Sequence, residues 1–297
     1  MSIYSVFYLF LLGVLASGED RSARIMNGLP AVPGAIPYQV SIESKAGKHF
    51  CGGSIIDEQH VLTAAHCMYS NKKRILFHRD SIQVWAGGTD RRYKQYTGIM
   101  KQVTNIFIHE HFNLTYSIND IAVLRIKGVF TFSSNVKPIE LSSSFVTAGA
   151  CNVSGWGYIT ANINLMSATL RYTEIIIAKL AECQSDYQMA EITSYMICAG
   201  DRNRMRDSCK GDSGGPLVCD GKLEGIVSFG TGCTEPHSLG IYTRVFSYKH
   251  WIHTQQTRSD SSQHFPMNSS DVFQLLIKET LHELKSNLNQ TQSNETW

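Results

Sequence analysis

The 297-residue sequence lacks the features that mark membrane, nucleic-acid-binding and zinc-ribbon proteins. Apart from residues 3–15 it has no apolar stretch that approaches the roughly 20 residues needed to span a bilayer. Its formal net charge is only +2, which argues against a strongly basic surface that would bind nucleic acid or anionic membranes. None of its eight cysteines forms a Cys-x-x-Cys pair, so no zinc ribbon is indicated, and we expect no metal and no cofactor.

The apolar run at residues 3–15 is rich in Leu, Phe and Tyr, and polar residues follow it at once. Ala16 and Gly18 are small residues at the two positions that a signal peptidase reads. We therefore interpret residues 1–18 as a secretory signal peptide, which predicts a secreted, extracellular protein without a membrane span. A buried N-terminal strand is the alternative. In a secreted chain eight cysteines suggest a disulfide framework, although spacing alone leaves the pairing open.

Residues 25 to about 252 form a series of short apolar or alternating runs, separated by Gly, Pro, Asn and Ser. Examples of the predicted strand regions are 38–42, 54–63, 81–86, 121–126, 169–178, 217–228 and 240–245. Because no long helix separates successive runs, the pattern predicts an all-β sandwich or barrel pair rather than an α/β fold. A single helix over residues 245–254 would close the domain.

The composition changes beyond about residue 257. Residues 258–270 are polar, whereas residues 271–288 carry apolar side chains at helical spacing. Isolated helices of this length are marginal in water, so this helix needs a surface to pack against. We expect residues 258–297 to be a C-terminal extension with one amphipathic helix, which takes no part in the chemistry.

Three short motifs follow one another in the order His, Asp, Ser. The segment Gly-Asp-Ser-Gly-Gly-Pro at 211–216 places Ser213 on a predicted tight turn, where glycines leave room for substrate and for backbone N–H donors. The segment Leu-Thr-Ala-Ala-His-Cys at 62–67 places His66 just past a strand end, and imidazole exchanges protons near pH ~6.5. Asp120 precedes an apolar strand. Singly these would be a surface turn, a packed histidine and a turn-capping aspartate; in this order they indicate a catalytic site.

Together the motifs resemble the chymotrypsin family of serine proteases, in its trypsin branch, over residues 25 to about 254. The resemblance implies two six-stranded antiparallel β-barrels with the active site between them, followed by a C-terminal helix. It implies that Ser213 is the nucleophile, His66 the general acid and base, and Asp120 the residue that orients His66. The N–H groups of Gly211 and Ser213 would form the oxyanion hole. An α/β-hydrolase would place the histidine last in the chain.

The resemblance also implies a specificity pocket with Asp207, six residues before Ser213, at its floor. A carboxylate there favours Arg or Lys before the cleaved bond. The other substrate-binding residues that it implies are Ser208, Ser228, Phe229, Gly230 and Gly240. Phe229 stands where the family usually has Trp. The implied partners are proteins or peptides cut after Arg or Lys, and protein protease inhibitors.

The segment Arg-Ile-Met-Asn-Gly at 24–28 resembles the family's activation site. Cleavage after Arg24 would free the amino group of Ile25, which in the family pairs with the acid before the nucleophile, here Asp212. Residues 19–24 are then an activation propeptide, and residues 25–257 the peptidase domain.

The resemblance pairs all eight cysteines, as Cys51–Cys67, Cys151–Cys219, Cys183–Cys198 and Cys209–Cys233. N-glycosylation sequons that we expect to be used are Asn113, Asn268, Asn289 and Asn294, whereas Asn152 lies in a predicted strand and we expect it to be unused.

Two loops depart from the family pattern. Residues 71–80 form a longer, basic segment that either flanks the cleft, where it would restrict substrates or favour acidic ones, or is a solvated insertion. Residues 87–96 correspond to a calcium-binding loop of many trypsins, but they offer Asp90 among basic residues, so we expect no calcium site.

A binding protein on an inactive protease scaffold is the alternative to an enzyme, but such proteins usually lack one of the three catalytic residues. Digestive, venom, immune and reproductive roles all stay open.

Overall fold

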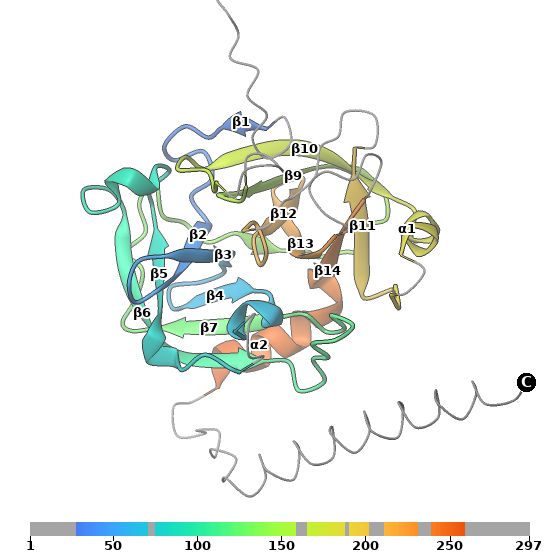
Figure 1. Cartoon of the computed structure of the whole chain (residues 1–297), viewed down its shortest axis with the longest axis horizontal. Coiled ribbons are helices and arrows are strands. Elements are labelled where there is room, and N and C mark those ends of the chain that lie inside the picture. Colours follow the sequence, from blue (N-terminus) through green and yellow to red (C-terminus); the bar gives the residue numbers. More distant parts are fainter. Residues whose placement is uncertain are drawn as a thin grey trace, which may run out of the picture. The chain divides into compact units, whose positions relative to one another are not determined.

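A computed structural model describes residues 28–70, 75–158, 165–187, 190–201, 211–230 and 239–258. The first half of this region forms a closed barrel in which the strand order is β2-β3-β4-β7-β6-β5 and all pairs are antiparallel. Its strands are β2 (Gln39–Ser44), β3 (His49–Ile55), β4 (His60–Thr63), β5 (Ile82–Ala86), β6 (Ile99–Ile108) and β7 (Ala122–Ile126). In Figure 1 it is the blue-to-green body at lower left.

The second half forms another antiparallel barrel, because β9 pairs with both β12 and β10 and so closes the order β10-β11-β14-β13-β12-β9. Its strands are β9 (Gly149–Gly155), β10 (Arg171–Ala178), β11 (Met196–Gly200), β12 (Pro216–Cys219), β13 (Lys222–Phe229) and β14 (Gly240–Arg244). Two short strands add to it: β1 (Leu29–Pro30) pairs with β10, and β8 (Glu140–Leu141) runs parallel to β13. The predicted pair of six-stranded barrels is confirmed.

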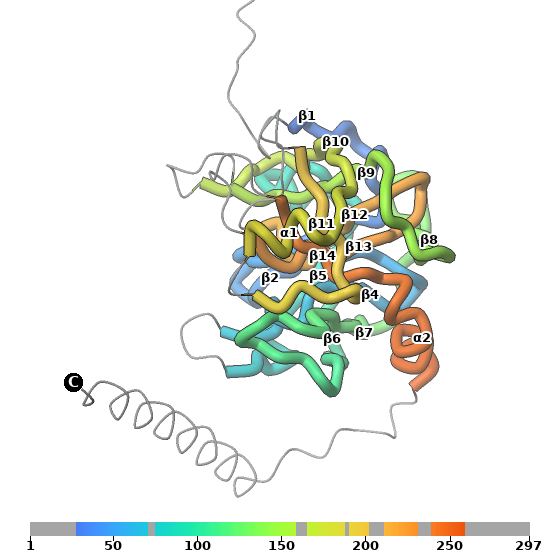
Figure 2. The backbone as a smooth tube through the Cα atoms, turned by 90° about the vertical axis from the view of Figure 1, so that its right-hand side faces the viewer, coloured from blue at the N-terminus to red at the C-terminus, as the bar shows by residue number. Residues whose placement is uncertain are grey.

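The helices are short and lie outside the barrels. They are α1 (Leu180–Asp186), α2 (Lys249–Thr257) and the 3₁₀ turns η1 (Ala65–Met68), η2 (Arg79–Ser81), η3 (Arg91–Tyr93) and η4 (Val245–Tyr248). The predicted closing helix is therefore a 3₁₀ turn that continues as α2. Ile252 of α2 is fully buried in the apolar cluster that fills the first barrel, and two views place α2 beside β7 (Figures 1 and 2).

The two barrels meet where glycines bring their backbones together. A Cβ at Gly52 of β3 would lie 3.0 Å from the Cα of Gly215, which directly precedes β12. Gln39 of β2 accepts a hydrogen bond from the Ser154 hydroxyl of β9 at 2.7 Å. The core of the first barrel also continues into Val218, Leu223 and Ile226 of the second. The segment 211–215, which holds Ser213, therefore lies at the junction between barrels.

Three disulfides link Cys51 to Cys67, Cys151 to Cys219 and Cys183 to Cys198, which are the pairs that the resemblance implied. The expected Cys209–Cys233 pair lies outside the described residues. The first bridge ties β3 to η1, and the second ties β9 to the end of β12. Each closed loop is expected to stabilise the fold by about 2–4 kcal/mol.

Two predicted strand regions are wrong in extent, because each is a hairpin. Residues 54–63 divide into β3 and β4, and the Asp57 carboxylate accepts hydrogen bonds from the backbone N–H groups of Gln59 and His60 in the turn between them. Residues 217–228 divide into β12 and β13 at Asp220 and Gly221, which adopt φ of 47° and 76°. Positive φ at two successive residues is the geometry of a tight type I′ hairpin turn.

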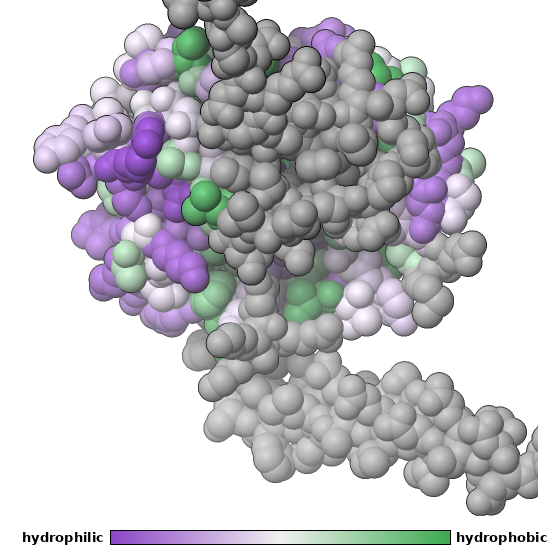
Figure 3. Space-filling model, turned by 45° about the horizontal axis from the view of Figure 1, so that its top comes forward, coloured by the Kyte–Doolittle hydropathy of each residue, from purple (hydrophilic) through white to green (hydrophobic). Residues whose placement is uncertain are grey.

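Within the described residues, no helix combines the length and apolar character that crossing a membrane requires. The described surface in Figure 3 is largely hydrophilic on the face shown, and its apolar side chains are scattered in small patches. Such scattered exposure is normal for a globular protein.

Candidate active site

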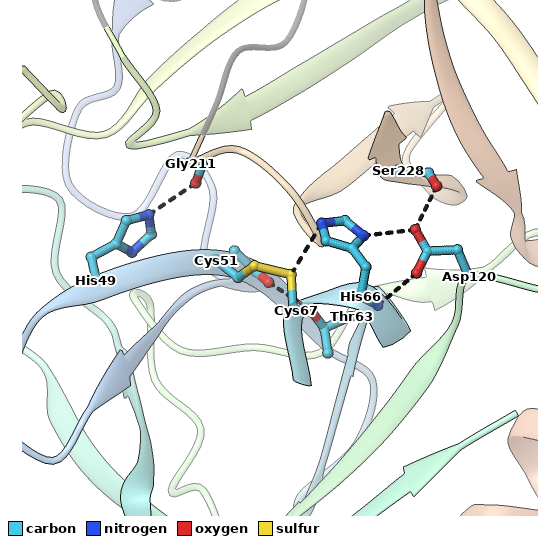
Figure 4. Close-up of a disulfide and its surroundings, with 9 residues drawn as sticks. His49, Cys51, Thr63, His66, Cys67, Asp120, Gly211 and Ser228 are labelled. Atoms are coloured by element: carbon cyan, nitrogen blue, oxygen red, sulfur yellow. Dashed lines mark hydrogen bonds and ion pairs between the residues drawn. A yellow bond between two sulfur atoms is a disulfide. The ribbon is translucent and has the colours of Figure 1, made fainter. Parts of the chain in front are cut away.

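His66 and Asp120 contact each other in the first barrel. β4 ends at Thr63, and η1 then carries His66 to the barrel edge, as the sequence predicted. Its Nδ1 lies 2.7 Å from Asp120 Oδ2, and its backbone N–H donates to Asp120 Oδ1 at 2.8 Å (Figure 4). Because the carboxylate accepts from Nδ1–H, the neutral ring has its lone pair on Nε2. The His66 side chain is 23% exposed and Asp120 is fully buried, so Nε2 is the ring atom available for proton transfer.

Asp120 is held from the second barrel by two hydroxyl groups that the sequence analysis did not assign to this role. Ser228 Oγ of β13 donates to Asp120 Oδ2, and Thr243 Oγ1 of β14 donates to the Asp120 carbonyl oxygen at 2.8 Å. Residues far apart in the chain therefore hold the side chain and the backbone of Asp120. No local motif could have indicated the role of Thr243.

The pKa values of this pair move in opposite directions. Burial of the ring lowers the pKa of His66, but the negative charge of Asp120 and its hydrogen bond more than offset this, so the pKa is raised above its ordinary 6.5. Burial raises the pKa of Asp120, and the charge and hydrogen bond of His66 together with the Ser228 hydroxyl reverse this, so the pKa is lowered. Asp120 is thus ionised at neutral pH and stabilises a proton on His66.

Ser213 stands on a tight turn whose backbone is fixed at both ends. Gly211 has φ of +97° and Gly214 has φ of +77°, which side-chain-bearing residues rarely adopt. The Ser213 carbonyl accepts from the Gly52 N–H at 2.8 Å, and the Gly214 N–H donates to the Val227 carbonyl at 2.8 Å. A Cβ at Gly214 would collide with the Thr63 hydroxyl, so this glycine permits the turn to pack against the strand that leads to His66.

Asp212, the residue before Ser213, is fully buried. Its Oδ1 accepts from the Gly157 N–H at 2.8 Å, and a Cβ at Gly155 would collide with the same oxygen. The carboxylate therefore lies in a narrow space lined by backbone.

Near the proposed activation site, Gly28 is the first described residue. Its carbonyl accepts from Arg171 Nη1 of β10 at 3.0 Å, and Leu29 pairs with Tyr172 of the same strand. The chain that follows the expected cleavage point is therefore anchored to the second barrel.

The described part of the region in which a specificity pocket is expected contains the end of β13 and the start of β14. Phe229 contacts the Tyr187 ring edge-on, with centroids 5.7 Å apart, and Tyr187 Oη donates to the Leu239 carbonyl at 2.6 Å. Gly230 is exposed and Gly240 is buried. Asp207 and Ser208 lie outside the described residues, as do Arg24, Ile25 and the sequons at Asn268, Asn289 and Asn294. Asn113 is exposed in a loop and Asn152 is exposed on β9.

In the loop at residues 87–96 the acid and two of the bases are engaged in ion pairs. Asp90 pairs with Arg92 in the same loop, and Lys94 reaches Glu43 of β2 with Nζ 2.7 Å from Oε2. In the basic segment 71–80, residues 71–74 are not described, and Arg79 and Asp80 belong to the exposed turn η2.

Among described residues, one group of side chains is close enough together to hold a metal ion. It consists of His66, Cys51 and Cys67, and the two cysteine sulfurs form a disulfide rather than thiolate ligands.

Two closed barrels that meet at a hydrogen-bonded His–Asp pair, with a serine on a glycine-rich turn beside it, define a chymotrypsin-fold serine protease. A family model described as Trypsin matches residues 25–252. The chain is 37% identical to trypsin from Sus scrofa, over 80% of this chain and 97% of that protein. It is 38% identical to trypsin I-P1 from Gallus gallus, over 80% and 91% of the two chains. The structure superposes on that of neuropsin, a serine protease of mouse brain, with a TM-score of 0.69, 31% identity and coverage of 77% of this chain and 98% of that one. The chain belongs to the trypsin family and is a trypsin-like serine endopeptidase that acts on protein substrates.

Proposed function

We propose that the chain is a secreted zymogen which, after cleavage behind Arg24, hydrolyses proteins and peptides after Arg or Lys through an acyl-enzyme on Ser213. The observation that carries this proposal is the hydrogen-bonded His66–Asp120 pair beside the Ser213 turn. Residues 1–18 are the signal peptide, 19–24 the propeptide and 25–257 the peptidase domain, with 258–297 as an accessory extension. Extracellular protein inhibitors of trypsin-like enzymes are expected partners.

In the proposed mechanism Ser213 Oγ attacks the substrate carbonyl carbon while His66 Nε2 takes the hydroxyl proton. The pair formed by His66 and Asp120 stabilises this proton, since the raised pKa of the imidazole reflects the nearby carboxylate. The N–H groups of Gly211 and Ser213 stabilise the oxyanion that develops. His66 then gives its proton to the leaving amine, and water hydrolyses the acyl-enzyme by the same steps.

Specificity in this proposal depends on Asp207. Replacing it with serine removes the one acid expected at the pocket floor, so the ratio of kcat/KM for Arg over Phe substrates should fall by about 10²–10⁴-fold. Cleavage profiling of both enzymes on a peptide library measures this ratio. Asp201→Ser, which changes an acid upstream in the same chain segment, serves as the matched control and should keep the Arg preference. An unchanged ratio in Asp207→Ser would place the pocket elsewhere.

The proposed role of His66 predicts a pH dependence. The neutral ring is the base, so kcat/KM should rise with pH as the proton leaves His66. Because Asp120 raises the pKa of His66, the midpoint of this acid limb should lie above 6.5. Loss of the carboxylate charge in Asp120→Asn should move the His66 titration, followed by NMR, to lower pH. A wild-type kcat/KM midpoint below pH 6.5 would contradict the proposed role of His66 as a base. An unchanged His66 titration in Asp120→Asn would also contradict it.

A further inference from the structure

A continuous set of short polar contacts leads from the loop at η3 through the first barrel to the Ser213 turn. Lys94 Nζ lies 2.7 Å from Glu43 Oε2, and Glu43 Oε1 lies 3.0 Å from the Ser41 hydroxyl. That hydroxyl lies 2.7 Å from His49 Nδ1, and His49 Nε2 lies 2.9 Å from the carbonyl oxygen of Gly211. Figure 4 shows the final contact, with the His49 ring facing Gly211. Ser41, Glu43 and His49 are all buried.

The outer end of this chain of contacts is an ion pair that is exposed on one side only. The Glu43 side chain is fully buried, whereas Lys94 is 25% exposed and also donates to the Gly47 carbonyl at 2.7 Å. A buried carboxylate without a cation is costly. Glu43 lies where β2 and β3 shift register and pairs across the strands with His49, an irregularity that brings the carboxylate and the ring to the same side.

The hydrogen-bond partners of His49 determine which of its ring nitrogens carries a hydrogen. The Gly211 carbonyl only accepts, so His49 Nε2 must carry a hydrogen. Burial, and then the positive charges of Arg91 and Lys94, lower the pKa of His49 to about 3, while its bond to Gly211 opposes them. The ring is therefore neutral, and its Nδ1 must accept from the Ser41 hydroxyl.

The Ser41 hydroxyl has one hydrogen and two acceptors within reach, His49 Nδ1 and Glu43 Oε1. The charge of Lys94 offsets that of Glu43 and weakens its competition for this hydrogen. The Ser41 hydroxyl donates to Glu43 Oε1 at 3.0 Å and lies closer to Nδ1, at 2.7 Å, so a weaker pull from Glu43 leaves its hydrogen available to Nδ1 and keeps Nε2–H directed at Gly211. Trp156 packs edge-on against the ring with centroids 6.0 Å apart, and so limits its rotation.

The Gly211 carbonyl is one of several groups that hold the turn in place. Others are the Ser213 carbonyl, which accepts from the Gly52 N–H, and the Gly214 N–H, which donates to the Val227 carbonyl. Holding the Gly211 carbonyl fixes the plane of the peptide that follows it, and the backbone torsions of Gly211, with φ of +97°, relate this plane to the direction of the Gly211 N–H. That N–H is an oxyanion donor in the proposed function.

We propose that Lys94 and Glu43 are positioning residues for the oxyanion hole, acting through Ser41 and His49 on the Gly211 peptide. The proposal rests on the proposed function of Ser213 and Gly211. It links the exposed loop at η3 to the stabilisation of the transition state rather than to substrate binding.

The test uses the full chain after activation, with active sites counted by a covalent titrant. Lys94→Met removes the cation that contacts Glu43 and Lys94→Arg retains it, while the charge of Arg91 acts on Glu43 in both variants. Ser41→Ala interrupts the series of polar contacts between Glu43 and His49 and leaves the Lys94–Glu43 ion pair in place. If Lys94→Met does not fold because Glu43 has lost its contacting cation, the Ser41→Ala variant still provides the test. Arg92→Met is the matched control, because Arg92 is a cation two residues away whose ion pair, with Asp90, stays within the same loop.

Two inhibitors separate transition-state from ground-state effects. A peptidyl arginine boronic acid forms a tetrahedral adduct whose oxygen occupies the oxyanion hole, whereas benzamidine binds the specificity pocket alone. Removing an oxyanion donor outright costs about 10²–10³-fold in kcat, so displacing one should cost about tenfold. We expect Lys94→Met and Ser41→Ala to lower kcat and boronate affinity by about tenfold in parallel. KM and benzamidine affinity should stay within about twofold. Lys94→Arg should restore kcat, and Arg92→Met should leave it unchanged.

The proposal is overturned if kcat stays within about twofold of wild type in both Ser41→Ala and Lys94→Met. It is also overturned if boronate and benzamidine affinities fall by the same factor, because that would indicate general loosening of the site. Failure of the proposed function gives a different result: Ser213→Ala would then keep its activity, whatever Lys94 does.

Discussion

Replacement of Ser213 by alanine is expected to lower kcat on an Arg ester or amide by on the order of 10⁶-fold. The change removes only the hydroxyl group, and alanine retains the contacts that hold the turn, among them the backbone bonds from Gly52 and to Val227 and the bond of His49 to Gly211. The variant should therefore unfold at the same temperature as the wild type and bind benzamidine with the same affinity.

The matched control for this variant is Ser144→Ala, which removes an exposed hydroxyl elsewhere on the surface. It should keep full activity. If Ser213→Ala, purified free of other proteases, turned over substrate at even a tenth of the wild-type rate, Ser213 would not be the nucleophile.

Replacement of Arg24 by glutamine is expected to leave the chain without activity after treatment with trypsin, while the wild type becomes fully active. In our account cleavage after Arg24 frees the Ile25 amino group, which pairs with Asp212. The buried Asp212 carboxylate lies directly before Ser213 and against Gly157, so a cation that binds there would order the turn. The anchoring of Gly28 by Arg171 holds the neighbouring chain on the same barrel.

N-terminal sequencing and active-site titration of the treated protein measure this outcome. Arg21→Gln is the control, since it removes another arginine of the proposed propeptide but keeps the proposed cleavage point, and it should activate normally. Full activity of Arg24→Gln without any chain that begins at Ile25 would contradict the activation mechanism.

Strands with a continuous apolar run and clear turn residues at their ends could be predicted from the sequence. The predicted ranges 81–86, 121–126 and 240–245 match β5, β7 and β14 to within one residue at each end. The division of residues 217–228 was also readable, because Asp-Gly at 220–221 is a strong hairpin signal. β6 was not predicted, since polar and apolar residues mix along it and its side chains are mostly half-exposed; pairing with β5 and β7 decides its conformation.

At the candidate site, the motifs indicated which residues matter but not what holds them. The positions of His66 past a strand end and of Ser213 on a glycine turn follow from local sequence, and the structure places both at the junction of the barrels. Thr243 and Asp120 are 123 residues apart, and Lys94 and Glu43 are 51 apart. Such contacts depend on how the strands close into barrels, so no local pattern reveals them.

The most direct test of the account is covalent labelling of the activated chain with a phosphonate that carries an arginine-like side chain, followed by peptide mass spectrometry. The account predicts one adduct per chain, on Ser213, in the protein that begins at Ile25. It predicts no adduct in the uncleaved chain or in Ser213→Ala. An adduct on another residue, or an active enzyme that the phosphonate does not label, would contradict it.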